Sequence, residues 1–468
     1  MISIDKELGP QALLPGLDQL WKVAEKSIVL LRENWDSEKG TPVFTQAGSY
    51  TSRGWTEWTQ GFQYGSALLL FEATGTEEFL DYGRAETLSR MAPHVSHTGV
   101  HDHGFNNVST YGTLLRQMSE ETIPEVEWER NFYELALKLT GAVQASRWTE
   151  LPDGLGFVPS FNGPHSLFSD TIRSMRALAL SHQLGHTLMG EQDRRISLFG
   201  RLLQHAEATA RFNVYYGTGR DSYDIRGRVV HESIFNTQSG AYRCPSTQQG
   251  YSPFTTWTRG LSWILAGYPE ELEWLENRTA GDLTASGTEL FGSLDEVRSR
   301  FVEVSRAVAD FYIDQTPTDG IPYWDTGAPG LTKLGDYLDR PADPYNEHEP
   351  VDSSAAAICA QGLLRLGHYL TRHGEKDDGE RYVQAGLSVA KTLLTDEYLA
   401  TDESHEGILL HSVYHQPNGW DYVAPGQKVP NGESCMWGDY HLLELGLAIK
   451  RLAEGKPMQR FFDIGGRS

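Results

Sequence analysis

The chain has few cysteines, and they lack the spacings that disulfide or zinc chemistry requires. Only Cys244, Cys359 and Cys435 occur among 468 residues, and no two of them form a CxxC pair. Disulfide frameworks and structural zinc sites need paired or clustered cysteines. His182 and His186 have the i, i+4 spacing of a metal-binding pair, but no acidic third ligand or HExxH pattern accompanies them. We therefore expect free thiols and no metal site.

Positive charge is scarce as well. The chain holds 40 Lys and Arg against 63 Asp and Glu, a formal net charge of −23. Phosphate binding needs a basic face, and none is visible, so nucleic acid is not expected as a partner. The same charge would slow the approach of an anionic sugar, so a site for a uronate would have to be locally positive.

Long apolar runs are absent. No uninterrupted apolar stretch approaches the ~20 residues of a membrane-spanning helix. The N-terminal sequence MISIDKELGPQALLPG has no basic region followed by an apolar stretch, so we expect no signal peptide. We predict a cytoplasmic protein without membrane contact, unless a leader was removed before this chain. The sequence gives no indication of the oligomeric state.

Amphipathic helical patterns are abundant, whereas sustained strand alternation is absent. Apolar residues recur at three- and four-residue spacing along the chain. Short hairpins are expected only inside long loops, as at Arg228–Ser239. The predicted helices are Leu17–Leu31, Trp58–Ala73, Glu77–Arg90, Gly104–Met118, Glu127–Ala145, Asp170–Leu184, Gln192–Arg211, 253–266, Leu294–Asp314, Asp352–Leu370, Gly379–Leu394 and Met436–Glu454.

Twelve helices joined by alternating short and long loops predict an all-α fold, the (α/α)6 barrel of six helical hairpins. The long loops precede every second helix and would lie on one face. No Pro/Ser-rich linker or charge-run boundary divides the chain, so we predict a single domain over residues 1–468. The rival fold is an open α-solenoid, whose repeats would resemble one another in sequence. We find no such repeat.

Polar and aromatic residues gather at the start of every second predicted helix. Alternate helices of antiparallel hairpins point the same way, so their first turns would meet at one end of the barrel. A pocket rimmed by carboxylates, imidazoles and indoles is typical of a carbohydrate-processing site. The residues concerned are Trp55, Trp58, His101-Asp102-His103, Asp170, Trp257, Arg259, Asp352-Ser353-Ser354, Trp437 and Asp439.

Five motifs resemble those of the unsaturated glucuronyl hydrolases, glycoside hydrolase family 88. His101–Phe105 (HDHGF) resembles the family's HDxGF, and Trp58–Phe62 resembles its WxxGF. Gln249-Gly250-Tyr251 followed by Trp257–Trp263 (WTRGLSW) is similar to QGY and WARGQAW. Val351–Ile358 and Trp437–Tyr440 resemble xDSSAAAI and WGDY. The matches occur in family order over roughly residues 55 to 450.

The resemblance implies a hydrolase that releases the unsaturated (C4=C5) uronic acid from the non-reducing end of lyase-generated oligosaccharides. One carboxyl group protonates C4, water adds at C5, and the hemiketal opens and expels the rest of the sugar. Asp170 matches the family's acid/base aspartate, and Asp102 matches the second essential aspartate. No metal or organic cofactor is implied, because acid, base and water complete the reaction.

The resemblance also implies substrate-binding residues. His231 and Gln249 match family positions near the substrate, and His101 lies beside Asp102. Tryptophan rings present flat apolar faces to the C–H faces of sugars, and Arg259 could receive the uronate carboxylate. The predicted substrate-binding residues are Trp58, His101, His231, Gln249, Trp257, Arg259 and Trp263.

Each candidate also has a structural interpretation. Aspartate at a helix start is usually an N-cap, and we interpret Asp352-Ser353-Ser354 in this way. Trp263 and Trp437 could be core residues. A lone aspartic acid has a pKa of about 3.9. A second carboxylate and tryptophan walls would raise the pKa of one of the pair, whereas a helix N-terminus would oppose this for Asp170.

Several departures from the family motifs leave the substrate open. Ser174 and Arg176 stand where the family commonly has Asn and Pro, with Arg173 added; the two arginines could recognise an anion or pair with the surplus acids. Pro253 and Phe254 replace two acidic residues that the family has after QGY, and Gln248 replaces the His that often precedes the family's Gln. Phe157 or Phe161 could substitute for an aromatic residue upstream of Asp170. Insertions at Glu270–Ser286 and Gly335–Pro350 are expected to reshape the rim.

Two other functions remain open at this point. Asp102 and Asp170 could cleave a saturated glycosidic bond by inverting hydrolysis, which needs carboxyl groups roughly 6.5–9.5 Å apart. A non-catalytic carbohydrate-binding toroid would keep the tryptophans but would not need the two aspartates.

Overall fold

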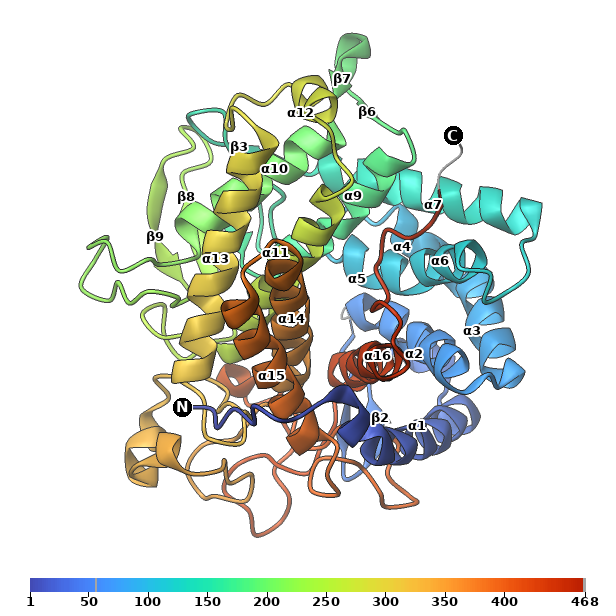
Figure 1. Cartoon of the computed structure of the whole chain (residues 1–468), viewed down its shortest axis with the longest axis vertical. Coiled ribbons are helices and arrows are strands. Elements are labelled where there is room, and N and C mark those ends of the chain that lie inside the picture. Colours follow the sequence, from blue (N-terminus) through green and yellow to red (C-terminus); the bar gives the residue numbers. More distant parts are fainter. Residues whose placement is uncertain (55–56, 466–468) are drawn as a thin grey trace.

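Six inner helical segments form a ring around a central axis (Figure 1). The structure, a computed structural model, describes residues 1–54 and 57–465. Helix α14 is buried along most of its length, and every residue of α11 is buried. The inner segments are α2 (Gln60–Thr74), α5 and α6 (His103–Asn107 and Thr113–Ser119, joined by a π-helical turn at Val108–Gly112), α8 and α9 (Thr171–Ser174 and Arg176–Gln183), α11 (Thr258–Leu275), α14 (Ser353–Arg372) and α16 (Met436–Ala453).

The inner ring is closed. Helix α2 packs on α5, α5 on α8, α8 on α11, α11 on α14, α14 on α16, and α16 packs back on α2. An open solenoid has no contact between its first and last repeats, so this closure confirms the predicted (α/α)6 barrel.

An outer helix accompanies each inner one. These helices are amphipathic, with an apolar face toward the inner ring and a polar face toward solvent. Helix α13, for example, buries Val297, Phe301 and Val308 on one face. The outer helices are α1 (Leu14–Asn34), α3 (Glu77–Arg90), α7 (Glu127–Ser146), α10 (Leu198–Phe212), α13 (Leu294–Asp314) and α15 (Lys376–Leu393); α4 (Ala92–Val95) and α12 (Ala280–Ser286) are short additions.

Short antiparallel strands decorate the loops. The predicted hairpin near Arg228–Ser239 is present as β8 (Glu232–Phe235) and β9 (Tyr242–Ser246), and β5 (Ser166–Phe168) pairs with β8, with Phe168 opposite Glu232. The other pairs are β1 (Phe44–Gln46) with β2 (Ser49–Thr51), β3 (Thr149–Glu150) with β4 (Gly156–Phe157), and β6 (Leu188–Met189) with β7 (Arg195–Ile196).

Two predicted helix boundaries were wrong. The helix predicted at 253–266 spans Thr258–Leu275, because Pro269 is tolerated inside it. Proline cannot donate to the carbonyl four residues earlier, and α14 approaches that carbonyl so closely that a Cβ on Gly362 would lie 2.2 Å from the Leu265 oxygen. The helix predicted from Gln192 begins at Leu198, where Ser197 caps it.

The expected rim insertion at Glu270–Ser286 was also wrong. Glu270 to Leu275 belong to the buried C-terminal part of α11, and α12 follows at the end of the barrel away from the first turns of the inner helices.

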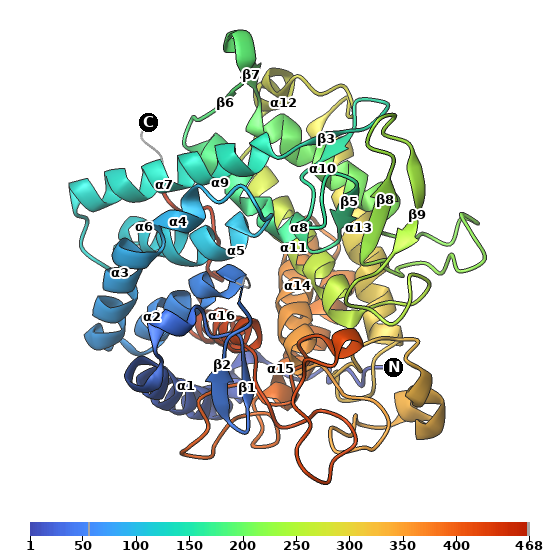
Figure 2. The same cartoon turned by 180° about the vertical axis from the view of Figure 1, so that it is seen from behind.

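Glycines bring the first turns of neighbouring inner helices into backbone contact. A Cβ on Gly61 of α2 would lie 2.4 Å from Asn106 Cα, and one on Gly104 of α5 would lie 2.5 Å from Ser174 Cα. Both distances are too short for any other residue. Figure 2 shows this end of the barrel, where the long loops that precede the inner helices lie in front.

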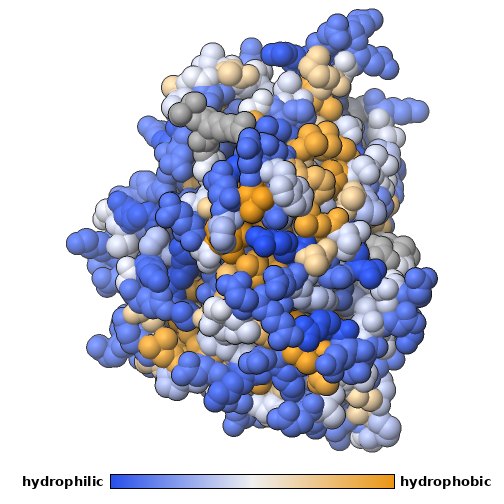
Figure 3. Space-filling view, turned by 90° about the vertical axis from the view of Figure 1, so that its right-hand side faces the viewer, coloured by the Kyte–Doolittle hydropathy of each residue, from blue (hydrophilic) through white to orange (hydrophobic). Residues whose placement is uncertain are grey.

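The outer surface is mainly hydrophilic, with scattered apolar patches (Figure 3). One apolar stripe follows the outward face of α7, where Trp128, Phe132, Leu135 and Leu139 are exposed. In the described part of the chain, no helix is both long enough and apolar enough to cross a membrane.

Candidate active site

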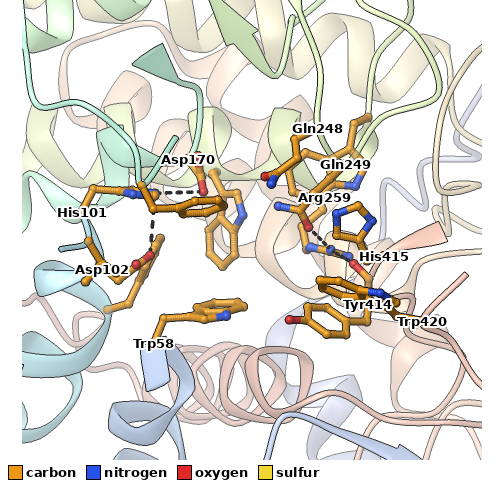
Figure 4. Close-up of a pocket in the computed structure, with 15 residues that line it drawn as sticks. Trp58, His101, Asp102, Asp170, Gln248, Gln249, Arg259, Tyr414, His415 and Trp420 are labelled. Atoms are coloured by element: carbon orange, nitrogen blue, oxygen red, sulfur yellow. Dashed lines mark hydrogen bonds and ion pairs between the residues drawn. The ribbon is translucent and has the colours of Figure 1, made fainter. Parts of the chain in front are cut away.

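The first turns of the inner helices and the loops before them line a pocket of about 670 Å³ (Figure 4). This volume includes the solvent-filled mouth of the pocket. Two carboxylates lie on one side, an amide and arginine group on the other, and indole rings lie between them. The lining residues are Trp58, Val100, His101, Asp102, Phe105, Phe161, Asp170, Gln248, Gln249, Trp257, Arg259, Trp263, Tyr414, His415 and Trp420.

His101 bridges the two candidate catalytic aspartates. Its Nε2 lies 3.4 Å from Asp170 Oδ2 and 3.7 Å from Asp102 Oδ1 (Figure 4). All three side chains are buried, and the two carboxyl groups retain only about a tenth of their exposure, toward the pocket. One imidazole therefore interacts with both carboxyl groups.

The side chains of the two candidate catalytic aspartates cap no backbone amide of the described residues. Asp102 and Asp170 precede α5 and α8, yet their side chains accept no capping hydrogen bond. Asp352, in contrast, accepts from the Ser354 and Ala355 amides at the start of α14 and pairs with Arg259. The capping interpretation therefore holds for Asp352 and is wrong for Asp102 and Asp170, whose oxygens are left for the pocket.

The three bridged groups have shifted pKa values. Burial raises the pKa of the Asp102 carboxyl; His101 opposes this, Asp170 adds to it, and the result lies above the ordinary value. Burial acts on Asp170 in the same direction, but the hydrogen bond and charge of His101 outweigh it and lower its pKa. Burial lowers the pKa of His101, and the two carboxylates outweigh burial and raise it. Hence the pKa of one carboxyl of the pair is raised, as predicted, and it is that of Asp102, whereas the pKa of Asp170 is lowered.

The HDHGF segment is held rigidly from behind. The His101 carbonyl accepts from Ser174 Oγ (2.5 Å) and Gln144 Nε2 (2.9 Å), and the Gly104 amide donates to Ser174 Oγ (2.8 Å). Ser174, which replaces a family Asn, thus connects α8 to the loop that carries His101 and Asp102. These bonds fix the distance between the two aspartates.

The arginine of the WTRGLSW motif is already engaged. Arg259 Nη1 donates to Asp352 (2.7 Å) and the Val413 carbonyl, and Nη2 donates to Gln249 Oε1 (3.2 Å) and the Tyr414 carbonyl (2.6 Å). Arg259 lines the pocket, as predicted. Its bonds fix the position of the Gln249 side chain and of the 413–414 backbone.

His231 lies behind the pocket wall and does not line it. Its Nδ1 accepts from the Gln248 and Gln249 amides (3.1 and 3.3 Å), which places the ring proton on Nε2. Burial lowers the pKa of His231 to about 4, so the ring is neutral. It packs edge-on against Trp257 at 4.7 Å. His231 therefore positions Gln249 and Trp257.

Arg173 and Arg176 pair with buried acids. Arg173 donates to Glu270 (3.0 Å) and Glu444 (2.8 Å), and Arg176 lies 3.4 Å from Glu270. Of the two alternatives left open for these arginines, pairing with acids is therefore confirmed, and neither arginine lines the pocket. Likewise, Trp437 and Asp439 are scaffold residues: Trp437 is fully buried under Trp58, and Asp439 accepts from Tyr50 and two backbone amides. Trp55 lies outside the described residues.

Several lining residues were not predicted. Tyr414, His415 and Trp420 come from the long loop before α16, which has no helix start or period to mark it. Phe161 does lie over His101, with ring centroids 6.1 Å apart, whereas Phe157 packs in a separate core cluster. The insertion at Gly335–Pro350, which lies within the described residues and was expected to reshape the rim, contributes no residue to the pocket lining. In residues 1–54 and 57–465, no group of three or more His, Cys, Asp or Glu side chains is arranged so that it could hold a metal ion.

The chain has relatives over most of its length, although no protein-family model matches it. The unsaturated glucuronyl hydrolase of Bacillus sp. (strain GL1) is 26% identical over 415 residues, which cover 86% of this chain and 89% of that one. The resemblance to the unsaturated glucuronyl hydrolases is confirmed. A second such enzyme, from Formosa agariphila, is 23% identical over 397 residues, covering 84% of this chain and 80% of that one.

The unsaturated glucuronyl hydrolase fold is shared as well. The crystal structure of such an enzyme specific for heparin matches with a TM-score of 0.69 at 21% identity, covering 94% of this chain and 97% of that one. The family motifs HDHGF, QGY and WTRGLSW, which are far apart in sequence, all contribute residues to the pocket described above.

Proposed function

We propose that this protein is a hydrolase that removes an unsaturated uronic acid from the non-reducing end of lyase-generated oligosaccharides by hydrating its vinyl ether. The observation that carries the proposal is the pair of aspartates without capping bonds, bridged by His101, in a tryptophan-lined pocket. The similarity to unsaturated glucuronyl hydrolases supports this chemistry over a saturated glycosidase or a non-catalytic toroid.

In this proposal Asp170 is the general acid and base. A proton on His101 Nε2, 3.4 Å from Asp170 Oδ2, can reach that carboxylate before it is delivered to C4. Water then adds at C5 and gives a proton back to Asp170. The C5 hemiketal opens to a ketone, and the hemiacetal at C1 releases the remaining sugar, so the proton is recovered at the end.

Asp102 has a different role. Its side chain lines the pocket without a capping bond, so its oxygens can accept hydrogen bonds from sugar hydroxyls, and its raised pKa favours the protonated form, which can also donate one. It also faces the same imidazole as Asp170, so its protonation sets how strongly His101 holds its own proton. Trp58, Trp257 and Trp263 would pack on the sugar ring, and Gln249 is presented by Arg259 and His231.

The test is a panel of lyase-generated unsaturated disaccharides, followed by the ultraviolet absorbance of the conjugated ene-carboxylate. We expect loss of absorbance with the wild type and none above background with Asp170→Asn. The saturated disaccharides of the same linkage are the control and should not be cleaved. Cleavage of the saturated set alone would overturn the proposed chemistry.

A cytoplasmic location and a single domain stay predictions from the sequence.

A further inference from the structure

Exposed aromatic rings cluster beside the pocket. Tyr223 and Phe254 stack with ring centroids 4.5 Å apart at 27°, yet they remain 49% and 42% exposed. Tyr251, on the same loop as Phe254, is 50% exposed. We call Tyr223, Tyr251 and Phe254 the aromatic shelf.

The loop that carries Tyr251 and Phe254 adjoins the pocket wall. Gln249 and Trp257 both line the pocket, so the loop 250–256 between them begins and ends in its wall. Phe254 is three residues from Trp257, and an extended chain spans at most ~3.6 Å per residue. Its backbone therefore lies within about 11 Å of the wall, the reach of the next few sugar rings along a bound chain.

A buried arginine holds the shelf in place. Arg228 Nε donates to the Tyr223 carbonyl (2.7 Å), and its Nη1 donates to the Pro253 carbonyl (3.1 Å). The Tyr251 amide donates to Asp325 Oδ2 (2.9 Å). The two loops are thus fixed to each other from beneath, and their rings face solvent without having to be ordered by a ligand, which lowers the entropic cost of binding.

We infer that the aromatic shelf is a binding subsite for pyranose rings beyond the first two sugars of the substrate. This inference rests on the proposed function. Exposed ring faces suit the C–H faces of pyranoses and are indifferent to the order of hydroxyl groups. Pro253 and Phe254, on one of the two shelf loops, stand where the resembled family has two acidic residues. Removal of those charges favours an acidic chain passing over the shelf.

The experiment compares an unsaturated disaccharide with the unsaturated tetrasaccharide of the same polymer. For Phe254→Ala and Tyr223→Ala, we expect KM for the tetrasaccharide to rise about three- to tenfold with kcat unchanged, because stacking is lost equally in ground and transition states. Values for the disaccharide should stay within about twofold of the wild type. Trp128→Ala, an exposed aromatic on outer helix α7, is the control and should change neither.

The outcomes separate the two proposals. Equal loss on both substrates would make the shelf a support for the pocket and overturn the subsite. An unchanged tetrasaccharide KM in both variants would overturn it as well. If the wild type turns over neither substrate, the proposed function fails, and the subsite inference fails with it.

Discussion

Aspartates begin three of the inner helices, and their contacts differ. Asp352 bonds two backbone amides and Arg259, whereas Asp102 and Asp170 share His101 and face the pocket. The sequence could identify all three as helix-start acids, since the helical periodicity begins there. It could not distinguish cap from catalyst without the motif resemblance, because the distinction depends on which donors the fold brings within reach.

Asp170→Asn and Asp352→Ala should therefore fail in different ways. Asp170→Asn removes a positioned acid, and we expect turnover to fall to the background of the absorbance assay, a loss of roughly 10²–10⁴-fold, with an unchanged melting temperature. Asp352→Ala leaves Arg259 buried without its partner and should cost about 3–5 kcal/mol of stability. Turnover and thermal unfolding of both variants check this. An Asp170→Asn protein as unstable as Asp352→Ala would contradict the role of Asp170.

The pH dependence of turnover should depend on His101. Its pKa is raised by the two carboxylates, so the proton is present below that pKa and is lost as pH rises through it. We expect an alkaline decline in kcat/KM for the wild type, and its loss or displacement in His101→Asn together with a lower rate. His205→Asn is the control, because burial lowers the pKa of His205 to about 3 and the ring is neutral throughout. The same decline in His101→Asn as in the wild type would refute this role.

Helices α8, α11 and α16 are joined by buried charges away from the pocket. Arg173 connects Glu270 of α11 to Glu444 of α16, and the Arg173 guanidinium lies 5.9 Å from the centroid of the Trp263 ring. The C-terminal segment closes over this network, where Arg365 donates to the Gln459 carbonyl (Figure 1). The sequence placed Arg173 and Arg176 correctly near the start of the helical segment that follows Asp170. It did not show which face of that segment they occupy.

Arg173→Met should strongly destabilise the fold. Buried Glu444 would lose its ion-pair partner and Glu270 would lose the closest of its arginines, and breaking a buried pair costs about 3–5 kcal/mol. Arg226→Met is the control: its pair with Asp310 is substantially exposed and is worth at most ~1 kcal/mol. Urea unfolding of both variants measures the difference. Equal, small losses would show that the buried network does not hold the three helices together.

At the scale of the element, periodicity predicted most helices, and Pro269 explains the main error. Proline usually marks a helix end, but the packing of α14 on α11 overrides that preference. Tyr414, His415 and Trp420 were beyond prediction because their loop reaches the pocket only through ring closure.

The whole molecule is a closed ring in which α16, late in the chain, packs against α2. Helix α1 packs on both of them, so the two ends of the chain depend on each other. We therefore expect a single cooperative calorimetric transition for the full chain, in agreement with the predicted single domain. Two resolved transitions would contradict it.

The central claim is that water adds to an alkene and not to an anomeric carbon. The most direct measurement is turnover of an unsaturated disaccharide in deuterated water, with the position of deuterium in the first product determined by NMR. The account predicts deuterium at C4, appearing at the rate at which the absorbance is lost, and no reaction with Asp170→Asn. Release of a product that keeps its C4=C5 bond, without deuterium at C4, would contradict it.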